Sequence, residues 1–164
     1  MKRMLFVLCV VAAVAGPTAA VSSAQSNKTI VQVAGSDPRF STLVGLVKQA
    51  GLANTLSTGS YTVFAPTNKA FAKVPKATLD ALAANPDQLK AVLTYHVAKG
   101  RLTAARVAKR TSVKTVNGAA IRVKVRGGRV FLNGSTLVTK ADIKARNGVI
   151  HVIDRVLLPP SSGN

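Results

Sequence analysis

Apolar residues recur at intervals of three and four in the first half of the chain, which predicts amphipathic helices. Asp37 and Pro38 stand where a helix N-cap and first residue are expected, and Gly51 is a natural stop. The apolar positions between them are Phe40, Leu43, Val44, Val47 and Ala50. We therefore expect a first helix to end at about residue 50.

A second helical stretch follows Pro75 and carries Leu79 and Leu82 on one side. Asn85-Pro86 should interrupt it, because proline lacks the amide hydrogen that a continuing helix needs. The helical period then resumes at Leu89, Val92 and Leu93. The sequence thus predicts two helices that meet at residue 85.

The back third of the chain changes to the two-residue period of strands. Residues 121–126 alternate apolar and basic side chains, and Gly127-Gly128 then predicts a hairpin turn into residues 129–132. Further strands are expected at 61–65, 136–139 and 149–153. Helices that precede most of the strands indicate an α+β fold in a single domain.

The first 24 residues have the pattern of an export leader. Lys2 and Arg3 precede twelve uncharged residues from Met4 to Ala15, and Ala24 is the favoured cleavage position. The only cysteine, Cys9, lies inside this leader. We expect a secreted or periplasmic protein with no membrane-spanning helix after leader removal, and a flexible tail at residues 161–164.

Composition argues against an enzyme and against a bound metal or other cofactor. The chain has five acidic residues and no glutamate, so paired-carboxylate chemistry has few candidates. It contains neither a G-x-S-x-G nucleophile motif nor a G-x-x-x-x-G-K phosphate loop. The two histidines, His96 and His151, lie in apolar stretches without further metal-ligand candidates, so we interpret them as hydrogen-bonded structural residues.

Three motifs resemble those of the fasciclin-like domain family. They are Thr62–Phe71, Tyr95-His96-Val97 and Asn147–Asp154, the last followed by Leu157-Leu158-Pro159. The resemblance covers residues 29–160 and implies a wedge of β-strands with helices packed at one end. It also implies a secreted or surface-anchored protein that mediates adhesion, contact with the extracellular matrix or symbiosis.

Within these motifs most side chains are expected to have structural roles in the core, in turns or in helix caps. This group contains Phe64, Pro66, Thr67, Asn68, Phe71, Asn147, Gly148, His151 and Asp154. Lys69 departs from the family pattern, which commonly has an acidic residue there. In adhesive animal members the segments matching Tyr95-His96 and Asp142-Ile143 are implicated in receptor binding, so these four residues are adhesion candidates, with core and turn roles as the alternative.

The distribution of charge is the property that most distinguishes this sequence. The formal net charge is +18, and no acidic residue occurs between positions 88 and 141. Period two places Arg122, Lys124 and Arg126 on one face of a strand. Arg129, Lys114 and Arg110 lie nearby in the sequence and complete the polyanion-binding candidates. Such a surface attracts polyanions.

Two function classes follow from these observations. The first is a cell-surface or matrix-binding module whose partner is an anionic polysaccharide, another envelope component or an acidic lipid headgroup at a membrane surface. The leader and the shortage of aromatic residues argue against nucleic acid. The second class, a carrier of an apolar molecule such as a lipid or carotenoid, is implied by some family members. It would need a groove lined by residues such as Val92, Leu93, Val130 or Leu132.

Overall fold

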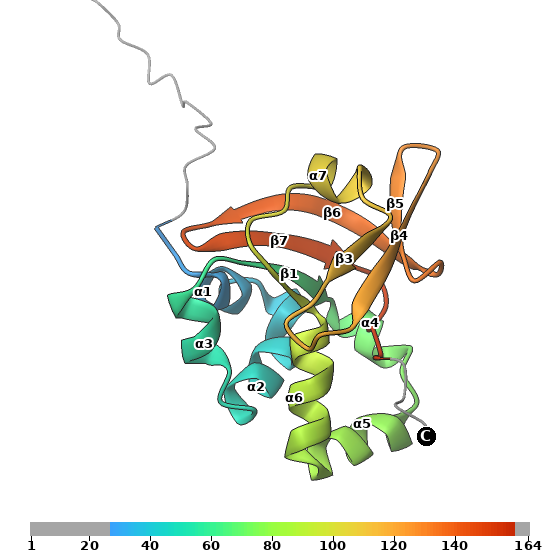
Figure 1. Cartoon of the computed structure of the whole chain (residues 1–164). Coiled ribbons are helices and arrows are strands. Elements are labelled where there is room, and N and C mark those ends of the chain that lie inside the picture. Colours follow the sequence, from blue (N-terminus) through green and yellow to red (C-terminus); the bar gives the residue numbers. More distant parts are fainter. Residues whose placement is uncertain (1–26, 160–164) are drawn as a thin grey trace, which may run out of the picture.

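A computed structural model describes residues 27–159. The predicted leader and the predicted tail at 161–164 lie outside these residues. Figure 1 shows a strongly curved sheet with most of the helices gathered beneath it, and the short α7 above. This arrangement agrees with the predicted α+β fold and with helices at one end of the sheet.

The predicted helices are present and end where their sequence signals indicate. Asp37 caps the first of them by accepting a hydrogen bond from the Arg39 amide, and Asn85 separates α5 from α6. The sequence analysis missed three short helices, α1, α3 and α7. The bounds are α1 (Ile30–Gly35), η1 (Pro38–Phe40), α2 (Ser41–Gln49), α3 (Ala53–Thr58), α4 (Asn68–Ala72), α5 (Lys76–Ala84), α6 (Pro86–Tyr95) and α7 (Ala104–Ala108).

Seven strands form one sheet in the order β2-β1-β7-β6-β5-β4-β3. The pair β1 and β7 is parallel and every other pair is antiparallel. A bridge between Ala98 and Thr115 brings the two outer strands together, so the sheet nearly closes into a barrel. The bounds are β1 (Tyr61–Pro66), β2 (Val97–Lys99), β3 (Ser112–Lys114), β4 (Ala120–Arg126), β5 (Arg129–Leu132), β6 (Thr136–Ala145) and β7 (Gly148–Ile153).

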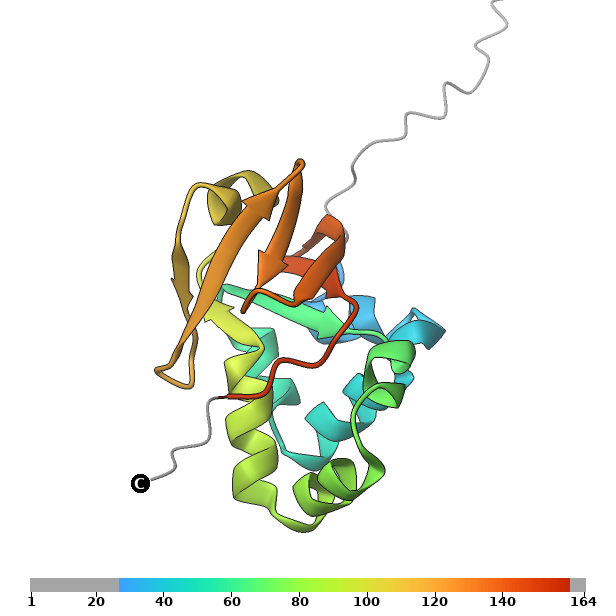
Figure 2. The ribbon, with the colours of Figure 1, turned by 90° about the vertical axis from the view of Figure 1, so that its right-hand side faces the viewer.

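Two hydrophobic cores occupy the two sides of β1 and β7. Side chains such as Val63 and Ile150 pack against the helices, whereas Phe64 and Ile153 point into the barrel with Ile121. All six residues of β7 are buried, as a strand with a nearly continuous apolar run, interrupted only by His151, predicts. Figure 2 shows the ribbon from the side, with β1 crossing above the helices and the β4–β5 hairpin rising in front of it.

The strand β6 is longer than the sequence predicts. The sequence predicts a strand at 136–139, but β6 continues to Ala145 and pairs with β7 through two register shifts. Asp142 lies between the paired positions Lys140 and Ile143 and has a positive φ of 57°. This irregularity interrupts the alternation on which strand prediction depends, and it also turns the Asp142 carboxylate toward α7.

Candidate functional site

The first family motif forms β1, its turn and the start of α4. Phe64 and Phe71 are buried in the two cores, and the chain leaves β1 at Pro66. The Thr67 hydroxyl caps α4 by accepting a hydrogen bond from the Ala70 amide. Asn68 instead donates to the Pro38 carbonyl at 3.0 Å, and so ties α4 to η1. Phe64 and Phe71 thus lie in the core, Pro66 ends the strand and Thr67 caps a helix, whereas Asn68 links two helices.

The turn before β7 is held by the Asn147 side chain. Its Oδ1 accepts a hydrogen bond from the Ile30 amide at 3.0 Å, and its Nδ2 donates to the Leu56 and Gly59 carbonyls. One side chain thus joins α1, α3 and the β6–β7 turn. Gly148 follows it at a point where an added Cβ would lie only 1.8 Å from the Tyr61 carbonyl oxygen. The close β1–β7 contact therefore excludes any side chain at 148.

Tyr95 and His96 are only 1% and 2% exposed, so neither side chain is available to a partner in this conformation. The His96 Nδ1 lies 2.7 Å from the Val92 carbonyl, and its Nε2 accepts a hydrogen bond from the Leu157 amide at 2.9 Å. These partners define a neutral ring protonated at Nδ1. Burial lowers the pKa of His96 to about 4, although the bond to Val92 acts in the opposite direction.

His151 is held in the other neutral form. Its Nε2 lies 2.7 Å from the Leu102 carbonyl and acts as the donor, because Nδ1 accepts a hydrogen bond from the Asp142 amide at 3.3 Å. Its ring stacks on Phe64, with centroids 5.6 Å apart. Burial lowers the pKa of His151, while the Leu102 bond and the Asp142 charge oppose that shift. Both ring nitrogens of each histidine are thus engaged in hydrogen bonds with the backbone.

The second adhesion candidate, Asp142-Ile143, lies on β6. Asp142 is exposed, and its Oδ1 accepts a hydrogen bond from the Ala104 amide at 2.8 Å, at the first turn of α7. Ile143 is half-buried and packs against the helix-side core. Of the four adhesion candidates, Asp142 is therefore the most accessible. Its backbone amide donates to the His151 Nδ1 at 3.3 Å, so its hydrogen bonds lead to α7 and β7.

Tyr95 contributes to the surface indirectly. Its hydroxyl accepts a hydrogen bond at 3.0 Å from the side-chain amide of Asn133. The Asn133 Oδ1 in turn accepts the backbone amide of Arg122 on β4. This chain of contacts connects the buried tyrosine to the strand that carries the basic side chains. Asp154 has a similar structural role, because its Oδ1 accepts the Leu137 amide at 2.9 Å.

Strand pairing places five of the six polyanion-binding candidates on one face, which we call the basic face. Arg126 on β4 lies directly opposite Arg129 on β5, and Lys114 on β3 lies opposite Ala120, two residues before Arg122. Side chains at directly opposed positions share a face of the sheet. The basic face therefore consists of Lys114, Arg122, Lys124, Arg126 and Arg129, all exposed. The sixth candidate, Arg110, is exposed in the loop before β3.

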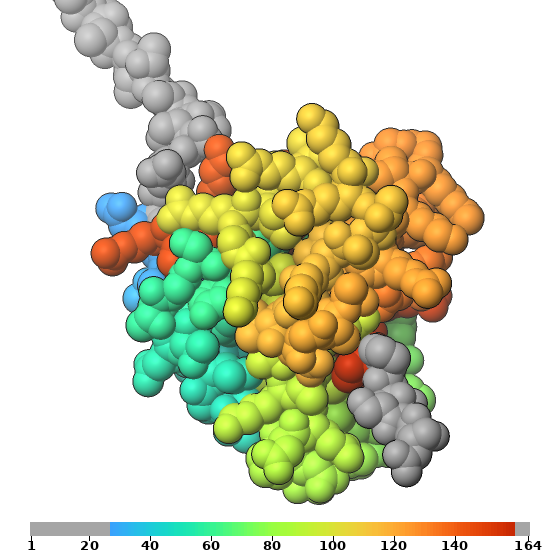
Figure 3. Space-filling view, viewed as in Figure 1, coloured from blue at the N-terminus to red at the C-terminus, as the bar shows by residue number. Residues whose placement is uncertain are grey.

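The basic face has little acidic neutralisation. Among the described residues there are two ion pairs, Arg39–Asp37 and Lys73–Asp154, and neither involves the hairpin. Two further acids, Asp80 and Asp87, belong to α5 and α6. In the space-filling view of Figure 3, these helices lie at the bottom, whereas β4 and β5 form the upper right. The protein is therefore positive on the hairpin and closer to neutral at the helical end.

An apolar cavity of about 190 Å³ lies at the helical end. Leu79 and Leu82 from α5 line it together with Val92 and Leu93 from α6. Val92 and Leu93 are two of the four residues suggested above for an apolar groove. The other two residues suggested for a groove do not line this cavity. Leu132 is fully buried in the barrel core, and Val130 borders a hollow of only about 10 Å³. The hollow beside Val130 is too small for a lipid or carotenoid.

Sequence reasoning missed a second basic cluster. Arg101, Lys144 and Arg146 border one open hollow, although 45 residues separate Arg101 from Arg146. No periodic pattern links such distant positions, so only the fold brings them together. Within residues 27–159 no group of three or more histidine, cysteine or acidic residues is placed to hold a metal ion. The same part of the chain has no helix long and apolar enough to span a membrane.

Comparison with known proteins agrees with the motifs and the fold. The fasciclin domain profile matches residues 38–159. Protein sll1483 of Synechocystis is 48% identical over 148 residues, which cover 87% of this chain and 81% of the relative. The cell surface glycolipoprotein MPB83 of Mycobacterium bovis is 34% identical over 89% of this chain and 66% of its own length. A solved fasciclin I domain pair from an insect cell adhesion molecule superposes with a TM-score of 0.65 and 24% identity, covering 80% of this chain and 51% of that one.

Proposed function

The chain belongs to the fasciclin domain family, and from this premise we propose that it is an exported, non-enzymatic module that binds anionic polysaccharide of a cell surface or matrix. The observation that carries the proposal is the basic face, on which five cationic side chains from three strands share one surface. A relative whose name places it at the cell surface supports the proposed location, secreted or periplasmic.

The geometry of the basic face suits an extended polymer. Alternate residues on one strand face are about 7 Å apart, since each residue advances roughly 3.3 Å. Arg122, Lys124 and Arg126 therefore form a row of regularly spaced charges, and Arg129 adds one more charge beside it. A polymer with repeated carboxylate, sulfate or phosphate groups can contact several of these cations at once. A small anion can contact only one or two of them.

Acidic lipid headgroups and nucleic acid could also contact such a surface through charge alone. Phe131 is the one aromatic residue on the face, opposite Lys124, and it is half-buried. Sequence-tolerant binding of single strands usually requires several exposed aromatic platforms. The basic face therefore favours a partner recognised by its charge spacing, and export favours a glycan over nucleic acid. Peripheral contact with an anionic membrane is a separate outcome of the binding test.

The test compares two variants with equal changes in net charge. One carries Arg122→Glu, Lys124→Glu and Arg126→Glu on the basic face. The control carries Lys48→Glu, Lys76→Glu and Lys90→Glu on exposed positions of α2, α5 and α6. Cosedimentation with an acidic polysaccharide, with intact cells and with vesicles of anionic lipid is measured across a salt series.

We expect the basic-face variant to lose at least about tenfold in polysaccharide affinity at low salt and to show a flatter dependence on salt, since fewer counterions are released. The control should bind like the unmodified protein. Equal losses in the two variants would reject the basic face and leave only general charge attraction. Binding to vesicles but not to polysaccharide would replace the glycan with a membrane surface as the partner.

The apolar cavity supports a second candidate function, carriage of an apolar molecule. The helix α5 borders the cavity with Leu79, Leu82 and Ala83 but contains no buried residue, so little packing holds it in place. Movement of α5 could therefore admit an acyl chain. Organic extraction of the natively purified protein should release a bound lipid if this function operates. Leu82→Trp, which fills the cavity, should abolish that loading, and a protein that is empty before and after the change would reject it.

A further inference from the structure

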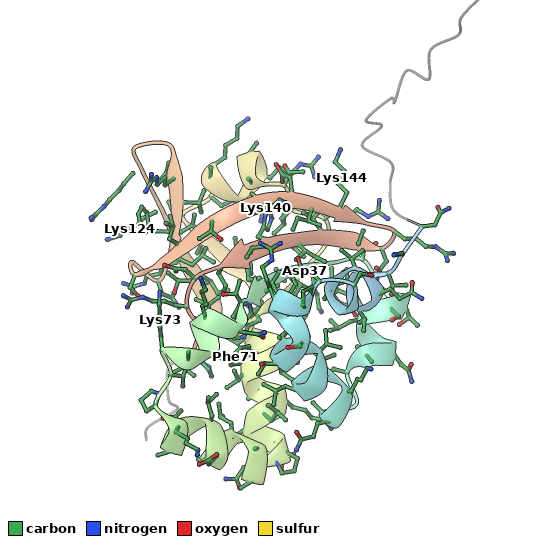
Figure 4. The ribbon with its side chains drawn as sticks, turned by 180° about the vertical axis from the view of Figure 1, so that it is seen from behind. Asp37, Phe71, Lys73, Lys124, Lys140 and Lys144 are labelled. Carbon is green, nitrogen blue, oxygen red and sulfur yellow. The ribbon has the colours of Figure 1, made fainter. Side chains whose placement is uncertain are left out.

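A second concave basic site lies at the opposite end of β6 from the hairpin. In Figure 4, Lys144 marks this end of the strand and Lys124 marks the distant hairpin. The hollow has a volume of about 230 Å³, where the β6–β7 turn meets the segment between β2 and α7. Its lining residues are Asn27, Arg101, Thr103, Lys144, Ala145, Arg146, Gly148 and Val149. It therefore shares no residue with the basic face.

Hydrogen bonds to the backbone hold the Arg101 guanidinium and the turn that carries Arg146. Arg101 donates from Nη2 to the Arg146 carbonyl at 2.7 Å, which fixes the guanidinium beside the hollow. The Arg146 amide donates to the Lys28 carbonyl at 2.9 Å, and the Asn147 side chain ties the same turn to α1 and α3. The turn is thus rigid before any ligand arrives. Preorganisation of this kind reduces the entropy lost on binding.

The local charge is strongly positive. None of the lining residues is acidic. The nearest carboxylate along the strand, Asp142, accepts a hydrogen bond from the Ala104 amide at 2.8 Å, and it is one acid beside three basic residues. Arg101, Lys144 and Arg146 therefore outnumber the acids around the hollow, and their field favours an anion within it.

We propose that this hollow binds a phosphate group carried by a sugar. A guanidinium offers five N–H donors in a planar arrangement that matches phosphate oxygens, and the one hydrogen bond of Arg101 to Arg146 uses only part of that capacity. The Thr103 hydroxyl and the Asn27 amide supply neutral donors at the border. The volume is that of roughly seven or eight waters at about 30 Å³ each, which accommodates the phosphate and part of the sugar. Ala145 and Val149 offer apolar contact to the ring.

Amide chemical shifts of the purified exported protein provide the test. Inorganic phosphate, glucose 6-phosphate and uncharged glucose are titrated in turn. Saturable shifts confined to residues 101–104 and 144–149 are expected with the two phosphates, and none with glucose. Tighter binding of the sugar phosphate by threefold or more would identify the sugar as part of the ligand. Equal binding of both phosphates would restrict the site to the free anion and overturn the sugar.

Arg101→Ala should weaken phosphate binding at least about tenfold, the loss expected for a charge-assisted hydrogen bond. Lys48→Ala removes one exposed charge elsewhere and should leave binding unchanged, as should Arg122→Ala on the basic face. If Arg101→Ala alters the whole spectrum, Arg101→Lys, which keeps the charge but lacks the planar donors, replaces it and should still weaken binding. Shifts that never saturate, or that map to the basic face, would overturn the site.

This inference does not depend on the proposed polysaccharide function. The basic-face variant retains Arg101 and Arg146, so it should still bind phosphate while losing the polymer. Arg101→Ala should behave in the opposite way. Loss of both activities in either variant would show that one diffuse field, rather than two sites, accounts for anion binding.

Discussion

At the scale of single residues, Gly148 is the position where the smallest change should have the largest effect on stability. An added methyl group would overlap the Tyr61 carbonyl on the neighbouring parallel strand. We expect Gly148→Ala to lower the free energy of unfolding by about 3 kcal/mol or more, since the obstructing atom belongs to the backbone. Urea unfolding followed by circular dichroism measures this loss.

Gly45 provides the matched control. It is exposed inside α2, and an added Cβ would meet nothing within 4 Å. Gly45→Ala should therefore raise the free energy of unfolding by roughly 0.5–1 kcal/mol, because alanine favours the helix over the unfolded chain. We therefore expect the same glycine-to-alanine change to lower the free energy of unfolding at position 148 and to raise it at position 45. Equal effects would contradict the close β1–β7 approach.

His96 should make the stability of the protein depend on pH. Burial lowers its pKa to about 4 in the folded protein, against about 6.5 in the unfolded chain. Between these values the unfolded state binds more protons. Stability is therefore complete above about pH 6.5 and falls as the pH decreases toward 4, by about 3 kcal/mol for this group. His151, whose pKa burial also lowers, adds to the loss.

Urea unfolding of the exported protein at a series of pH values from about 4.5 to 8 measures this slope. In His96→Gln the group cannot titrate, so the slope should decrease even though the variant is less stable throughout. A stability that stays constant, or that increases toward acid pH, would show that the ring is charged in the folded protein. In that case the Leu157 amide could not donate to its Nε2.

At the scale of elements, the short helix α7 depends on a contact from another strand. No residue of its own sequence gives it a side-chain N-cap hydrogen bond, but Asp142 on β6 accepts the Ala104 amide. Asp142→Ala should cost about 1–2 kcal/mol, because it removes this bond and places alanine at positive φ. Asp142→Asn keeps an acceptor and tolerates that backbone conformation, so it should cost less than about 0.5 kcal/mol.

The same pair of variants separates a structural Asp142 from an adhesive one. If the residue acts only on α7, polysaccharide and cell binding should be unchanged in Asp142→Asn. If the carboxylate contacts a partner, as the family resemblance suggested, Asp142→Asn should lose binding while thermal unfolding stays the same. Cosedimentation with cells and a thermal scan of the same preparation decide between these roles.

The helices that the sequence analysis missed have two different explanations. The predicted helices α2 and α6 carry periodic apolar faces, and Asp37 caps η1. By contrast, α7 begins where Ala104 donates to Asp142, which lies 38 residues away, so local sequence carries no signal for it. At α1 a local signal exists, because Thr29 and Gln32 form a capping box, but the helix is only six residues long and its first amide is also held by Asn147, 117 residues away. Strand alternation alone predicts the row Arg122, Lys124 and Arg126, whereas strand pairing adds Lys114 and Arg129 to the basic face. The Arg101–Arg146 hollow requires the complete fold.

At the scale of the whole molecule, positive charge should make folding depend on salt. Twenty-three basic residues face five acidic ones, and like charges in a compact state repel one another. On the basic face Arg126 lies directly opposite Arg129, so two like charges are held close together there. Raising NaCl from about 0.02 M to about 0.5 M shortens the Debye length severalfold and should therefore raise the melting temperature of the unmodified protein.

The single change Arg126→Glu tests whether the charges that repel one another are also the charges that bind polysaccharide. It places opposite charges at a directly paired position, so it should stabilise the hairpin by up to about 1 kcal/mol relative to the like-charged pair. It should also lower affinity for acidic polysaccharide, since it removes one cation from the row on β4. Thermal unfolding and cosedimentation at low salt measure both effects. A variant that is more stable but binds less would indicate that the charges serve recognition, whereas unchanged binding would show that Arg126 contributes only to net charge.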